Sequence, residues 1–147
     1  MDQSLSQPFE DEQERAVVSL VVTYNHLLGM MQAALKPFKI NDQHYNVLKM
    51  LEAHYPEHLQ VGTIKELLFN KRGDLTRLLD KLYQMGLITR ETNSHNRRMV
   101  DIRLSEQGSE TLKEIDVQLE GYRQLRKNLS EEEAQQLVTL LEKLRTP

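Results

Sequence analysis

The sequence contains no cysteine, which excludes disulfide bonds, thiolate metal ligands, a cysteine nucleophile and a thiol-based redox switch. It also has no glycine-rich phosphate loop, no zinc-protease pattern and no visible pairing of a catalytic acid with a base. His54 and His58 are four residues apart, but Pro56 breaks the helix that would bring them onto one face. We therefore expect neither an enzyme nor a bound metal or cofactor.

Long apolar runs are missing as well, since none approaches the roughly 20 residues that a helix needs to cross a bilayer. The first residues, Met1 to Pro8, have neither the basic start nor the apolar stretch of a signal peptide. We therefore expect a cytoplasmic protein with no membrane partner. Its 147 residues suffice for one core, and no repeat, low-complexity segment or linker divides them. The prediction is a single domain, 1–147.

Excess positive charge is absent too, and the net charge of −3 is unusual for a protein that binds nucleic acid. The distribution of charge is more informative than its sum. Acidic residues crowd the two ends, at 10–14 and 131–133. The middle third instead gathers basic residues, which are Lys71, Arg72, Arg77, Lys81, Arg90, Arg97, Arg98 and Arg103. This pattern predicts a basic face on a weakly acidic body, which is compatible with binding duplex DNA.

Hydrophobic periodicity predicts a mainly helical chain. The first helix, 11–36, carries an apolar stripe that is wide enough to need more than one partner helix. A second helix begins at Asn41 or Asp42, either of which can cap it, and ends before Pro56. Leu59 and Val61 are expected in a very short strand.

The rest of the chain continues this helical pattern around one hairpin. A third helix opens at Thr63 with Glu66 three residues on, a capping-box pairing, and buries Ile64, Leu67 and Leu68. After a turn at 69–73, the fourth helix runs to about Met85 and ends at Gly86. Strands are expected at 87–91 and 100–104, one helix from Ser105 through Leu125, and a last helix that opens with the capping box Ser130 and Glu133.

The segment from Thr63 to Leu104 is the most informative, because a helix-turn-helix is followed at once by a hairpin with arginines in its loop. This is the arrangement by which a winged helix meets DNA. The fourth helix keeps its leucines on one side and polar side chains near its start, as a recognition helix must. The predicted DNA-binding residues are Lys71, Arg72, Asp74, Thr76, Arg77 and Lys81 on and before this helix, and Asn96, Arg97 and Arg98 in the loop.

Two of these assignments have an alternative. Asp74 is able to accept a hydrogen bond from a cytosine amino group, but an acid at this position also stabilises a helix start. Arg97 and Arg98 either insert beside the DNA backbone in the narrow minor groove or form an ordinary solvated loop tip. Their position directly after the amphipathic pair of helices favours the first interpretation.

Five segments in this order and spacing resemble the MarR family of winged-helix regulators over most of the chain. They are Ile40–Leu48 (INDQHYNVL), Leu75–Leu82 (LTRLLDKL), Gly86–Arg90 (GLITR), and Asn96–Arg98 followed by Leu104–Gly108 (LSEQG). The resemblance departs from the family at the wing, where the family motif is Asp-x-Arg and Asn96 stands at the Asp position. Asn still forms hydrogen bonds to arginine but contributes no charge, so a less rigid wing or a weaker minor-groove contact is expected.

The resemblance implies a homodimer that binds a pseudo-palindromic operator on double-stranded DNA. The winged-helix part would cover about 41–104, with dimerisation helices at about 10–36 and 105–147. Family members usually repress transcription, often until a small aromatic or phenolic effector binds between these parts. Two-fold symmetry also agrees with the wide apolar first helix, which needs a partner surface.

Two questions stay open on the sequence alone. Tyr24, His26, Met30 and Tyr45 are candidates for an effector pocket, but each fits equally well as core or dimer interface. The alternative to a DNA-binding regulator is a winged-helix module that binds another protein, in which the basic loop serves only solubility.

Overall fold

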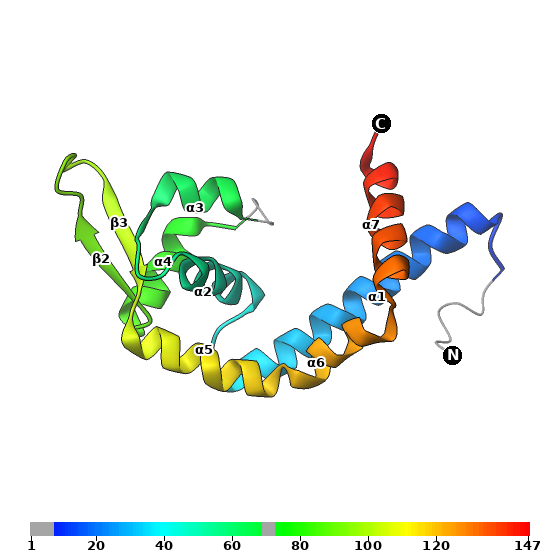
Figure 1. Cartoon of the computed structure of the whole chain (residues 1–147), viewed down its shortest axis with the longest axis horizontal. Coiled ribbons are helices and arrows are strands. Elements are labelled where there is room, and N and C mark those ends of the chain that lie inside the picture. The colour runs from blue at the N-terminus through cyan, green and yellow to red at the C-terminus, as the bar shows by residue number, and fades with distance from the viewer. Residues whose placement is uncertain (1–7, 69–72) are drawn as a thin grey trace.

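The computed structural model describes residues 8–68 and 73–147, which form two connected parts (Figure 1). The body contains α2 (Asp42–His54), β1 (Leu59–Gln60), α3 (Val61–Leu67), α4 (Leu75–Gln84), β2 (Ile88–Thr92), β3 (Val100–Leu104) and α5 (Glu106–Gln118). The arm contains α1 (Glu12–Leu35), α6 (Glu120–Leu125) and α7 (Glu131–Arg145), with the short turns η2 (Lys36–Phe38) and η3 (Arg126–Asn128). The arm extends away from the body, and the wing hairpin lies at the opposite end of the molecule.

The sheet of the body has three antiparallel strands in the order β1-β3-β2. Leu59 pairs with Ile102, and Ile88 pairs with Leu104 at the base of the hairpin. The expected short strand is present at Leu59, but Val61 is the first residue of α3 and not part of the strand. The predicted fold class, mainly helical with a small hairpin wing, is confirmed.

The core is a cluster of leucine and isoleucine side chains from every large element of the body. Leu48 and Leu51 of α2, Leu82 of α4 and Ile102 of β3 are fully buried in it. Leu112 and Ile115 place α5 in the same cluster, and Leu35 fixes the end of α1 there. The winged-helix core therefore includes α5, which the sequence assigned to the dimerisation region.

A close contact between the end of α4 and the start of α5 explains two glycines of the family-like segments. Gly86 has a φ of 74°, which terminates α4 in a conformation that glycine favours. A Cβ at Gly108 would lie 2.1 Å from the Leu87 carbonyl oxygen, so no side chain fits there. Ser105 joins the two turns, because its hydroxyl donates to the Gly86 carbonyl at 2.6 Å and accepts from the Gly108 amide at 2.9 Å.

Helix boundaries follow local capping at most positions. Asn41 caps α2 in a reciprocal box with His44, and Ser130 caps α7 in a box with Glu133, as the sequence predicts for the second pair. The prediction for α3 was wrong, because the helix begins at Val61, two residues before Thr63, and has no side-chain cap. Leu67, expected in the core, is 47% exposed.

The C-terminal helices also differ from the expectation of one continuous helix from Ser105 through Leu125. The chain breaks at Leu119 into α5 and α6. Leu119 is buried in the body, whereas the residues of α6 are not. The break therefore marks the place where the chain leaves the core and enters the arm.

The arm exposes much of its apolar surface. None of the residues of α7, all of which the structure describes, is buried, and Leu140 is 62% exposed. The segment Glu12–Phe38 is also, by length and a mean hydropathy of 1.2 alone, able to span a membrane. The expectation that no segment reaches this criterion was wrong, because Ala16–Leu35 contains no charged residue although polar side chains such as Asn25 and Gln32 interrupt it.

Candidate nucleic-acid interface and ligand cavity

The start of α4 is organised by Asp74. Its Oδ1 accepts a hydrogen bond from the Arg77 amide at 3.3 Å, and its Oδ2 lies 3.7 Å from Arg77 Nε. The aspartate therefore caps the helix, which is the structural alternative that the sequence left open. Capping leaves the side chains of the following turn free to point outward.

The two faces of α4 are chemically distinct. Leu75, Leu78, Leu79 and Leu82 are buried on one face. Thr76, Arg77 and Lys81 are exposed on the other, and the Arg77 side chain is 88% exposed. The exposed face of α4 is therefore cationic and able to form hydrogen bonds, while the buried leucines anchor the helix in the core. Lys71 and Arg72, which were predicted to extend this surface, lie outside the described residues.

The hairpin is tied to α4 through Arg90 of β2. Its Nη2 lies 2.7 Å from Asp80 Oδ1, and its guanidinium lies 5.1 Å from the centre of the Tyr83 ring. These contacts hold β2 against α4. Sequence reasoning counted Arg90 only as part of a basic cluster, since nothing local indicates a partner on the preceding helix.

The loop between β2 and β3 presents the predicted wing. Its ends are closed by a hydrogen bond from the Asn93 amide to the Met99 carbonyl at 3.0 Å. Asn96 Oδ1 accepts from the Arg98 amide at 3.1 Å, so this side chain holds the backbone of Arg98. Arg97 and Arg98 are exposed at the tip, where they are available to an anionic partner.

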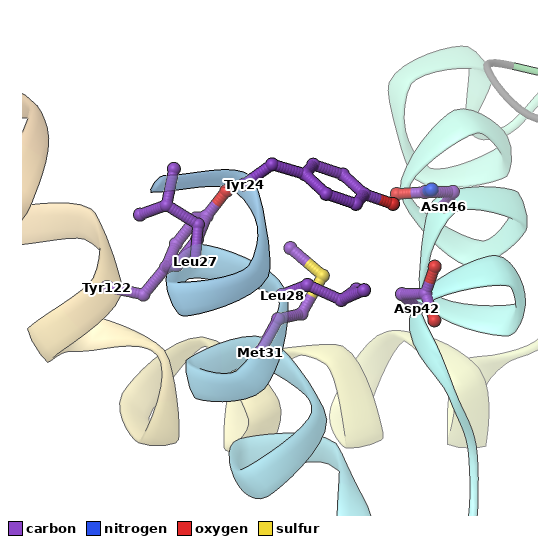
Figure 2. Close-up of a pocket in the computed structure, with 7 residues that line it drawn as sticks. All are labelled: Tyr24, Leu27, Leu28, Met31, Asp42, Asn46 and Tyr122. Carbon is purple, nitrogen blue, oxygen red and sulfur yellow. The ribbon is translucent and has the colours of Figure 1, made fainter. Parts of the chain in front are cut away.

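A cavity of about 430 Å³ lies between the arm and the body. It is lined by Tyr24, Leu27, Leu28 and Met31 of α1, Asp42 and Asn46 of α2, and Tyr122 of α6. Figure 2 shows Tyr24 reaching from α1 toward Asn46, above Leu28 and Met31. The lining combines apolar and aromatic surface with one carboxylate, and no Lys, Arg or His side chain lines it within the part of the chain that the structure describes.

Beside this cavity, a polar cluster joins α2 to α5 and α6. Tyr45 Oη donates to Asp116 Oδ1 at 3.5 Å, and Asp116 also pairs with Arg123 Nη2 at 2.5 Å and with Lys49 Nζ at 3.8 Å. Burial, reinforced by the negative charge of Asp116, raises the pKa of the Tyr45 hydroxyl, so the hydroxyl stays protonated and donates. The cluster therefore connects α2 and α5 of the body to α6 of the arm.

Comparison with known proteins gives one family and a consistent set of structures. Residues 40–100 match the model of the MarR family. A MarR transcription factor from Planctomyces limnophilus is 28% identical with a TM-score of 0.69, and the match covers 92% of this chain and 98% of that one. A mutant MarR from E. coli complexed with operator DNA is 22% identical with a TM-score of 0.76, covering 95% and 100%. The S. aureus MepR–DNA complex is 23% identical with a TM-score of 0.76, covering 87% and 94%.

Residues 40–100 form a MarR-family domain. The resemblance seen in the sequence is thereby confirmed for this segment, and the members of this family are transcription regulators, not enzymes. The matched segment contains α4 and most of the wing, so it includes both surfaces described above.

The predicted effector residues are only partly brought together. Tyr24 lines the cavity, whereas Tyr45 is buried beside it in the cluster around Asp116. His26 is exposed and Met30 is half-buried on α1, and neither is among the lining residues. Asp42, Asn46 and Tyr122 line the cavity without having been predicted, because only the packing of α1 and α6 on α2 brings them together.

The described residues contain no group of three or more His, Asp or Glu side chains placed to hold a metal ion. His54 Nδ1 lies 2.8 Å from the Met50 carbonyl oxygen, and His58 Nε2 lies 3.2 Å from Asp101 Oδ2. The two histidines therefore have separate partners.

Proposed function

We propose that this MarR-family protein binds a pseudo-palindromic operator as a homodimer and represses transcription in the cytoplasm until an effector releases it. The observation that carries the proposal is the exposed cationic face of α4, held to the wing by Arg90 and Asp80. A helix of this kind fits the major groove, while the wing reaches the adjacent minor groove. Two structures of the same fold are complexes with DNA.

On this proposal, Arg77 and Thr76 contact base edges, and Lys81 contacts a phosphate. The exposed Arg77 guanidinium, whose contact with Asp74 is 3.7 Å long, is able to bond guanine in a bidentate way. Arg97 and Arg98 contribute positive charge to the minor groove. Lys71 and Arg72, which lie outside the described residues, stay predicted DNA contacts on the sequence alone.

The arm supplies the dimer interface. Apolar side chains on both long helices of the arm are exposed, among them Val17, Val21, Tyr24, Leu137, Val138, Leu140 and Leu144. Monomeric proteins rarely leave so much contiguous apolar surface in water, so a second copy of the chain is the natural cover. A two-fold axis through the arm would set two α4 helices about one helical turn of DNA apart.

The effector is proposed to occupy the cavity between α1, α2 and α6. Tyr24, Tyr122 and Met31 offer surface to an aromatic ring, while the Asp42 carboxylate disfavours an anion. A neutral or cationic aromatic compound therefore fits better than a phenolate. Such a ligand would contact both the arm and the body and would change the angle at which each α4 meets the operator.

The test is selection of bound duplexes from a random DNA pool by the purified protein, with the affinity of the selected sequence measured across salt concentrations. Enrichment of a palindrome, bound by a dimer with a steep salt dependence, supports the proposal. Failure of a folded protein to enrich any sequence at low salt would contradict it and would favour a winged-helix module that binds protein.

A further inference from the structure

Asp101 is a charged residue in an unexpected place. It is the second residue of β3, where the alternation of the strand predicts an exposed side chain, yet it is only 7% exposed. It is paired in the sheet with Gln60 on one side and Glu91 on the other, so a second acid stands directly opposite. A buried carboxylate with a like charge across the strand costs stability unless specific partners compensate.

The partners of Asp101 come from two separate loops. Asn93, the first residue of the wing loop, points its Nδ2 at both carboxylate oxygens, at 3.1 Å to Oδ1 and 3.0 Å to Oδ2. His58, in the segment between α2 and β1, places Nε2 3.2 Å from Oδ2. Since a carboxylate only accepts hydrogen bonds, the Asn93 amide is the donor to Asp101, and the His58 ring lies close enough to pair with the same carboxylate.

The side-chain oxygen of Asn93 forms hydrogen bonds within the wing loop. Its Oδ1 accepts from the backbone amides of His95 and Asn96, both at 2.9 Å. The orientation of the amide is therefore unambiguous, with nitrogen toward Asp101 and oxygen toward the loop. Asn96 continues the series, because its own Oδ1 accepts from the Arg98 amide.

We infer that Asp101, Asn93 and His58 form a wing anchor. The anchor positions Arg97 and Arg98 for the minor groove and so takes over the role of a charged residue at position 96. Hydrogen bonds run from the buried carboxylate through Asn93 and Asn96 to the backbone of Arg98. The wing is ordered from its base, so Asn96 does not need to pair with an arginine side chain. This inference rests on the proposed function, since it concerns how the same DNA contact is positioned.

The decisive experiment exchanges the two side chains of the anchor. Asn93→Asp places two carboxylates face to face, while Asp101→Asn leaves two amides and removes the charge. The double variant, Asn93→Asp with Asp101→Asn, restores an amide-to-carboxylate pair with the donor and acceptor reversed. Asp at 93 still offers an oxygen to the His95 and Asn96 amides. Glu91→Gln is the matched control, because it also removes one negative charge at the same level of the sheet.

Each variant is measured for affinity to the selected operator across salt and for protection of the DNA grooves by footprinting. We expect Asn93→Asp to bind about tenfold more weakly, with a salt slope reduced by about one to two units, and the double variant to recover most of both. Minor-groove protection should be lost in Asn93→Asp while major-groove protection by α4 persists. Glu91→Gln should bind at least as tightly as the parent protein.

Asn93→Asp with parental affinity and salt slope would overturn the inference, as would a double variant no better than either single variant. Circular dichroism shows whether each variant folds. If Asn93→Asp does not fold, the comparison of Asp101→Asn with the double variant decides the question. Measurements on the parent protein separate the two proposals. If the protein binds an operator without protecting the minor groove, the wing anchor alone is contradicted. If no operator sequence is selected, the proposed function is contradicted.

Discussion

Most leucine side chains are buried in the body, whereas several are exposed in the arm. In the body, leucines such as Leu48 and Leu112 are completely buried, whereas in the arm Leu137 is 44% exposed and Leu140 is 62% exposed. Both sets follow the helical spacing of an amphipathic helix, so their patterns in the sequence are alike. The difference shows that the body completes its core within one chain and that the arm has apolar surface left over.

This contrast distinguishes the apolar contacts that stabilise one subunit from the apolar surface that is available for dimerisation. Burial of an apolar side chain contributes to folding only where the same chain supplies the surrounding atoms. The body should therefore be stable in its own right, while the helices of the arm should gain much of their stability from a partner.

Leu112→Ala in α5 should lower the free energy of unfolding by about 2–5 kcal/mol, because it empties a fully enclosed site between α5 and the rest of the core. Denaturant unfolding at several protein concentrations provides the measurement. The loss should be similar at each concentration, since the cavity lies within one subunit. A loss below about 1 kcal/mol would show that α5 is not part of the body's core.

Leu140→Glu in α7 should separate the subunits without unfolding the body. A carboxylate forced into an apolar interface costs about 3 kcal/mol, which raises the Kd of dimerisation roughly a hundredfold. Sedimentation of the variant should show a monomer with the circular dichroism of a folded chain. Ala53→Glu is the matched control, because Ala53 is exposed on α2 in the body. An unchanged dimer in Leu140→Glu would place the interface elsewhere.

Arg77→Ala in α4 should weaken binding to the best operator by about 1–3 kcal/mol and relax the base preference at one position of each half-site, if Arg77 reads a base. Stability should hardly change, because the side chain is exposed. Arg126→Ala, which removes an exposed arginine from the turn η3, controls for the loss of one positive charge. An equal loss on every DNA sequence would assign Arg77 to a phosphate.

His44 should give the smallest effect, a pH dependence confined to the body. Burial, with the positive charge of Lys81 as a second cause, lowers the pKa of His44 below 6.5. The neutral ring also accepts the Asn41 amide at Nδ1, at 3.2 Å. The unfolded chain therefore binds a proton more readily, so this contribution to stability is present above about pH 6.5 and decreases as the pH falls.

His44→Gln keeps a capping-box residue at this position but does not titrate. Thermal unfolding between pH 7.5 and 5.5 should therefore show a smaller decrease of Tm in the variant than in the parent protein. Equal decreases would mean that His44 is not a source of the acid sensitivity.

Much of this molecule was predictable from the sequence because its signals are local. Helical spacing located α1, α2 and α4, alternation located β3, and capping residues such as Asn41 and Ser130 marked helix starts. The order of these elements was enough to predict a winged helix and the exposed residues of α4 and the wing. A cap or a periodic stripe depends on residues within a turn or two, so a single sequence contains it in full.

Only the tertiary structure decided the features that depend on distant residues. The alternation of β3 predicts an exposed Asp101, but the side chain contacts His58 and Asn93, which come from two different loops. The break at Leu119, the exposure of Leu67 and the cavity beside Tyr24 likewise depend on which elements pack together. The bond from Tyr45 to Asp116 joins residues 71 positions apart, and no local pattern specifies such a pair. Short-range spacing determines which elements form, whereas burial and charge pairing are determined only when those elements meet.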